Sequence, residues 1–103
     1  MPGNKPEGTL VWQTDRYPAL GAVSGEKAYL GPNEAYELIV LSMPGAAGYP
    51  AYFRWEVWGG PLHGNILKTG ETSGVEVAKA AAEACARRFL AMAQLLVQEV
   101  GTP

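Results

Sequence analysis

The segment Tyr52-Phe-Arg-Trp-Glu-Val-Trp58 decides the fold of this chain. Successive side chains of an extended strand point to opposite faces of a sheet. One predicted face is apolar and holds Phe53, Trp55 and Val57. The other predicted face is more polar and holds Tyr52, Arg54, Glu56 and Trp58. Clean alternation of this kind is typical of a strand that is covered on one side only.

Strands are also predicted on both sides of this segment. A Gly-rich turn over residues 59–64 leads into a last strand at about Asn65 to Thr72. The strongest earlier strand is Tyr36 to Met43, whose centre is apolar on both faces. Thr9 to Arg16 is a plausible first strand, and a short one fits around Lys27 to Leu30. Because the later connections are short, we expect an antiparallel meander of four strands, or of five if the short strand forms.

The C-terminal part of the chain predicts a long helix from Ser73 to Val100. Ser73 followed by Glu76 has the spacing of a capping box, and Gly101 suits the position just after the helix. At about 100° per residue, one stripe is apolar: Ala78, Ala81, Ala82, Cys85, Phe89, Met92, Leu96 and Val100. The predicted fold is therefore α+β, with this helix packed on the sheet face of Phe53, Trp55 and Val57, where Trp55 and Phe89 are expected to be largely buried.

The helix is longer than the sheet that it covers. About 26 helical residues span about 39 Å, whereas a strand of about seven residues spans about 23 Å. The last turns are therefore expected to leave a row of apolar side chains without sheet beneath them: Leu90, Met92, Leu95, Leu96, Val97 and Val100. Either the N-terminal segment folds over this row, or a second copy or another protein covers it.

Composition predicts one small domain. The chain has 103 residues and a formal net charge of −2, so residues 9–103 form a single domain with no basic footprint for a polyanion. Residues 1–8 are rich in Pro and Gly and are expected to be a disordered tail. The single cysteine, Cys85, suits a reducing cytoplasm. We find neither a signal peptide nor an uninterrupted apolar run that would span a membrane.

Residues capable of chemistry are scattered rather than grouped. His63 is the only histidine and lies in a turn, where a solvated side chain is the commoner outcome than a base or a ligand. Cys85 falls in the apolar stripe of the helix, which favours an inert buried thiol over a nucleophile. We therefore expect neither an enzyme nor a bound cofactor or metal ion. The more specific candidate for a binding site is an exposed aromatic and cationic face made by Tyr52, Arg54 and Trp58.

Three stretches resemble a pattern in short bacterial and prophage proteins: Phe-Arg-Trp-Glu-Val-Trp-Gly-Gly, Ile-Leu-Lys-Thr-Gly-Glu-Thr and Val-Ala-Lys-Ala-Ala-Ala-Glu-Ala. In those proteins a Trp-rich hairpin precedes a final helix with the pattern Ala-Lys-x-Ala-Ala-Glu. The resemblance covers about the last half of the chain and implies a sheet with one helix. The resemblance brings no assigned activity, and a regulator or inhibitor carried by a phage or another mobile element fits that class of proteins.

The same half resembles the C-terminal half of a double-stranded RNA-binding domain. Ala78, Lys79, Ala81 and Ala82 match its helix pattern, but Val-Glu-Val over residues 75–77 replaces the lysines that would contact phosphate. The resemblance therefore implies a shared topology, and we expect no binding of double-stranded nucleic acid. The sequence as a whole favours a non-enzymatic protein-interaction module. The alternative is single-stranded nucleic-acid binding through Tyr52, Arg54 and Trp58.

Overall fold

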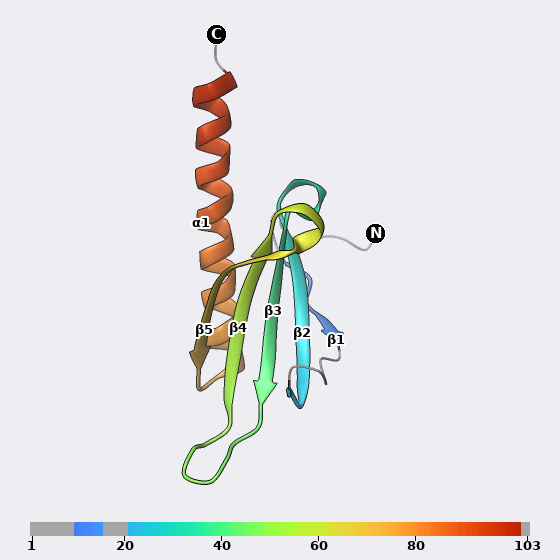
Figure 1. The fold of residues 1–103 in the computed structure, drawn as a ribbon, viewed down its shortest axis with the longest axis vertical. Coiled ribbons are helices and arrows are strands. Elements are labelled where there is room, and N and C mark those ends of the chain that lie inside the picture. Colours follow the sequence, from blue (N-terminus) through green and yellow to red (C-terminus); the bar gives the residue numbers. More distant parts are fainter. Residues whose placement is uncertain (1–9, 16–20, 102–103) are drawn as a thin grey trace.

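The structure is a computed structural model that describes residues 10–15 and 21–101, with side chains up to Val97. Five strands form one antiparallel sheet in chain order, and a long helix follows them (Figure 1). The elements are β1 Gln13–Asp15, β2 Ser24–Leu30, β3 Tyr36–Met43, β4 Tyr52–Gly59, β5 Asn65–Thr72 and α1 Val75–Gly101. The predicted α+β meander is confirmed, and it has five strands. The expected tail, residues 1–8, lies outside the described residues.

The register of β3 against β4 explains which face the helix covers. Val57 lies opposite Leu38, and Trp55 lies opposite Val40, so these four side chains share one face of the sheet. Leu38 and Val57 are fully buried and pack with the helix residues Ala82, Cys85 and Ala86. The face predicted for the helix is therefore the one that it covers.

Alanine lets the helix approach the sheet closely. Ala78, Ala82 and Ala86 are each 0% exposed, and they lie along the sheet-facing side of α1. Each of these alanine side chains ends at its Cβ atom, so larger side chains from the strands fill the layer between helix and sheet. The N-terminal residue Trp12 joins this layer, with the Lys79 ammonium 5.4 Å from its ring centroid.

Two hairpins end in the same kind of turn at one end of the sheet. The β2–β3 turn begins Gly31-Pro32 and the β4–β5 turn begins Gly60-Pro61, and both glycines have positive φ. In each turn the next two residues also have positive φ, at 57° and 54° for the pair starting at Asn33 and at 56° and 51° for the pair starting at Leu62. The shared Gly-Pro dipeptide is the sequence signal for this repeated turn.

The start of the helix differs from the prediction. Helix α1 begins at Val75, so Gly74, not Ser73, precedes the first helical residue. Its carbonyl accepts the first helical hydrogen bond, from the amide of Ala78. Ser73 lies one position too early for its hydroxyl to reach the free amides of the first turn, and the expected capping box is therefore wrong.

The helix overrun is present. In Figure 1 the C-terminal part of α1 projects past the turns at one end of the sheet. The helix has 27 residues, against eight in each of β3, β4 and β5. Trp12 contacts the helix near Lys79, in its first turns. The described N-terminal residues therefore pack over the covered part of α1 and leave the projecting part open.

Candidate functional site

The sheet face turned away from the helix is organised around a buried carboxylate, Glu56. This side chain is only 4% exposed, and the Trp58 indole N–H donates to its Oε1 at 2.8 Å. The Arg54 Nε atom lies 2.9 Å from its Oε2, as an ion pair without hydrogen-bond alignment. A buried carboxylate requires partners of this kind, because burial of an unpaired charge is strongly unfavourable.

The structure therefore brings the predicted aromatic and cationic residues together but turns two of them inward. Tyr52, Arg54 and Trp58 lie on one face of β4, as expected, and all three are half-buried. The charge of Arg54 and the donor of Trp58 are both directed to Glu56. The sequence placed Glu56 on this face but gave no sign that it would be the group that neutralises the cation.

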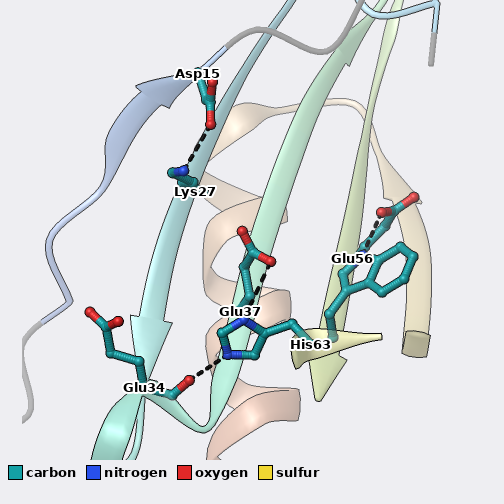
Figure 2. Close-up of polar contacts among 7 residues, drawn as sticks. Asp15, Lys27, Glu34, Glu37, Glu56 and His63 are labelled. Atoms are coloured by element: carbon teal, nitrogen blue, oxygen red, sulfur yellow. Dashed lines mark hydrogen bonds and ion pairs between the residues drawn. The ribbon is translucent and has the colours of Figure 1, made fainter. Parts of the chain in front are cut away.

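His63 makes contacts that the sequence did not reveal. Its Nε2 atom hydrogen bonds to the backbone carbonyl of Glu34, and its Nδ1 atom lies 3.9 Å from Oε1 of Glu37 (Figure 2). Since a carbonyl can only accept, Nε2 carries the proton in this bond. The Tyr29 ring lies 5.8 Å from the imidazole, centroid to centroid. His63 thus joins the two Gly-Pro turns, and the expectation that it would simply be solvated is wrong.

A second ion pair lies on the same face, toward the N-terminal edge of the sheet. The Lys27 ammonium is 2.9 Å from Asp15, which fixes β1 to β2 (Figure 2). The hydrogen bond to Asp15, followed by the influence of Tyr29, raises the pKa of Lys27. The cations Lys27 and Arg54 of this face are thus each paired with a carboxylate.

The projecting part of α1 carries the largest exposed apolar side chains of the helix. We call Met92, Leu95, Leu96 and Val97 the helix patch, and they are 58%, 56%, 59% and 70% exposed. Leu96 continues the stripe whose earlier members Ala78 and Ala82 are fully buried. Of the other predicted residues, Leu90 is half-buried against the core, and the Val100 side chain lies outside the described residues.

A groove of about 370 Å³ lies between β5 and α1, beside the helix patch. We call it the edge groove, and its principal lining residues are Trp55, Lys68, Cys85, Arg88, Phe89 and Met92. Trp55 and Phe89, which are expected to be largely buried, pack against the core and are partly exposed at this opening. The alanine stretch of α1 packs over Leu38 and Val57, and the small side chains of Ala81 and Ala84 leave space in front of β5.

Burial at the floor of the edge groove affects the single cysteine. Cys85 is 9% exposed, and burial raises the pKa of its thiol above the ordinary value of 9.0. The nearby charges of Arg88 and Lys68 act in the opposite direction and are the smaller influence. The thiol is therefore kept protonated at neutral pH, as expected for a buried and unreactive cysteine.

Within residues 10–15 and 21–101, no three His, Cys, Asp or Glu side chains are grouped as they would be around a metal ion. None of the helices in that part has the length and apolar character to cross a membrane.

Comparison with known proteins identifies no relative of this chain. No protein-family model matches its sequence, and no curated protein does so. Among solved structures, none matches its fold.

Proposed function

We propose that the chain is a non-enzymatic protein-interaction module that binds through the helix patch. The single observation that carries this proposal is the exposure of Met92, Leu95, Leu96 and Val97 on consecutive turns of a helix that projects from its sheet. Side chains of this size each gain about 1.5–3 kcal/mol when they are fully buried. A contiguous apolar patch is characteristic of a surface that another protein covers.

The helical form of the patch supports a helix-to-helix contact. Met92, Leu95 and Leu96 lie at intervals of three and four, so that a partner helix or groove can receive them as a set, and Val97 lies to one side of them. A two-fold contact between copies of the chain is the commonest arrangement for a small homo-oligomer, and a different protein partner is the alternative. The resemblance to short prophage proteins supports a regulator or inhibitor that acts through such a contact.

A photo-crosslinking experiment tests the proposal directly. A photoreactive phenylalanine analogue replaces Leu96 in cells that naturally make the protein, and Val77 is replaced in the matched control. Val77 is an exposed apolar residue of the same helix, 61% exposed, but it lies at the sheet-covered end. We expect a discrete crosslinked product from position 96 and none from position 77. No product from either position, or equal products from both, would overturn the proposal.

Sedimentation separates the two kinds of partner. If the contact is between copies, the wild type is a dimer and Leu96→Glu, Val97→Glu is a folded monomer. Val77→Glu should remain a dimer, since it adds the same charge outside the patch. A wild type that stays monomeric at high concentration excludes the homodimer and leaves a different protein as the partner.

Binding of single-stranded nucleic acid through Tyr52, Arg54 and Trp58 has weaker support. Stacking sites of this type combine exposed aromatic rings with free cations that follow the phosphates. Here Arg54 is paired with Glu56, and the net charge of the chain is −2. A salt-dependent change in tryptophan fluorescence on addition of an oligonucleotide would favour this function over the interaction module.

A further inference from the structure

The edge groove combines an apolar floor with two positive charges that form no ion pair with the described residues. Among the described residues, the other cations all form ion pairs: Lys27 with Asp15, Arg54 with Glu56, Lys79 with Glu26 and Arg87 with Glu83. Lys68 and Arg88 are the described cations without an ion pair, and both line the edge groove. One comes from the sheet and the other from the helix, so the charges lie on the two walls of the same apolar surface.

The floor between these charges is aromatic and aliphatic. Trp55, Phe89 and Met92 line it, and each is partly buried or exposed. The Trp55 ring lies over Gly70 of the edge strand, where a Cβ atom would come within 2.6 Å of it. The indole N–H of Trp55 donates to no described residue, unlike that of Trp58. The groove thus offers apolar contact area together with a donor and two cations that have no acceptor among the described residues.

The open side of the groove is the edge of the sheet. Among the described residues, β5 pairs only with β4, and its eight residues contain no proline. Its outer backbone N–H and C=O groups are therefore free to pair with another chain. Helix α1 lies behind β5 in Figure 1, so a strand added to this edge would be backed by the helix.

We propose that the edge groove binds an acidic, apolar segment of a partner protein, laid in extended form along β5. The proposal rests on the proposed function in that its occupant is a protein. Apolar side chains of the segment contact Trp55, Phe89 and Met92, and its carboxylates pair with Lys68 and Arg88. A polypeptide fits better than a free fatty acid, because only a polypeptide also satisfies the backbone groups of β5.

Selection from a displayed library of random peptides tests this chemistry. The peptides are about ten residues long, the upper length of a typical strand. We expect enrichment of sequences that combine Asp or Glu with aromatic or aliphatic residues. Bound peptides should shift the fluorescence of Trp55, which lines the groove, and slow the hydrogen exchange of β5 amides. Failure to enrich any peptide, or enrichment of peptides without acidic residues, would overturn the proposal.

Matched charge reversals locate the bound peptide. Arg88→Glu should weaken a selected peptide by about ten- to a hundredfold, as for the loss of hydrogen bonds to a charged group. Arg87→Glu makes the same substitution at the adjacent residue, which does not line the groove, and should leave affinity nearly unchanged. Lys68→Glu should behave like Arg88→Glu. Equal effects of the two arginine variants would place the peptide elsewhere and overturn the proposal.

Dodecanoate distinguishes the alternative occupant. If dodecanoate shifts the Trp55 fluorescence and no peptide does so, the groove is a site for free amphipathic anions and the proposal is wrong. This outcome is separable from failure of the interaction module, because crosslinking from position 96 reports on the helix patch. A crosslink at position 96 with no peptide in the groove would retain the module and reject the groove.

Discussion

The Trp55 indole lies directly against the backbone of Gly70 on the neighbouring strand. The two residues are partners in the β4–β5 register, and a Cβ atom on residue 70 would lie 2.6 Å from the indole nitrogen. Real Cβ contacts are longer than this, so only glycine permits the ring to cross β5 at this height. The absence of a side chain at position 70 therefore determines the position of the Trp55 ring, which lines the edge groove.

Gly70→Ala should destabilise the fold and displace Trp55. The added methyl group forces the indole out of its position, and overpacking of this kind costs about 1–3 kcal/mol. Urea unfolding measures the loss, and the emission spectrum of the tryptophans reports the displacement. Gly74→Ala is the control, because its Cβ would meet only Val77 at 3.8 Å. Equal unfolding midpoints for the two variants would contradict the close contact.

Glu56→Gln should destabilise the protein by about 1–3 kcal/mol. The amide keeps an acceptor for the Trp58 N–H, but it leaves Arg54 without its anion. Because Arg54 is 40% exposed, solvent compensates part of the loss. Glu34→Gln makes the same change at an exposed position of the β2–β3 turn and should alter stability by less than about 0.5 kcal/mol. Chemical denaturation measures the free energy of unfolding of both variants. Equal losses would mean that the contacts of Glu56 with Arg54 and Trp58 do not stabilise the fold.

Truncated side chains should lower the free energy of unfolding where the helix covers the sheet, and should change it little in the projecting part of α1. Leu38→Ala removes a side chain that is 0% exposed and should cost about 2–5 kcal/mol. Phe89→Ala should cost about 2 kcal/mol, below the range for a fully buried phenylalanine, because Phe89 is partly open to the groove. Leu96→Ala should change monomer stability by less than about 0.5 kcal/mol. A large loss for Leu96→Ala in a monomer would show that the patch is internally covered.

The Cys85 thiol predicts a loss of stability at alkaline pH. Its pKa is raised in the folded state, so the unfolded chain releases this proton first as the pH rises through the ordinary value of 9.0. The contribution is fully present below pH 9.0 and is lost as the pH approaches the higher folded pKa. Wild type should therefore lose stability relative to Cys85→Ala above pH 9.0. A constant difference between pH 7 and pH 10 would contradict burial of the thiol.

The sequence predicted the elements whose pattern is local. The alternation of β4 and the alanine stripe of α1 each report which side faces the core, and the register confirms both. The predicted start of the helix was wrong by one residue, because both Ser73 and Gly74 are residue types favoured at the position before a helix. The first strand is shorter than expected within the described residues, with β1 limited to Gln13–Asp15.

The surfaces could not be predicted as well, because they depend on contacts between distant residues. Glu56 meets Arg54 and Trp58 on one strand, yet only the burial of that face makes the carboxylate their shared partner. His63 bonds to Glu34, 29 positions away, through two turns that meet only in the folded sheet. The edge groove exists because small helix residues face β5. Which helix residues face β5 depends on how the helix crosses the strands in the folded protein.

The projection of α1 beyond the sheet also separates its local stability from that of the core. Short helical segments without tertiary support are marginal in water, so the projecting turns should open without global unfolding. A partner that binds there must order the segment as it binds, and affinity then depends on helix propensity as well as on contact. Ala91→Gly, at an exposed residue beside the patch, should weaken a complex by about 1 kcal/mol, measured as a faster dissociation of the partner. The length of this helix thus makes its affinity adjustable by residues that the partner never touches.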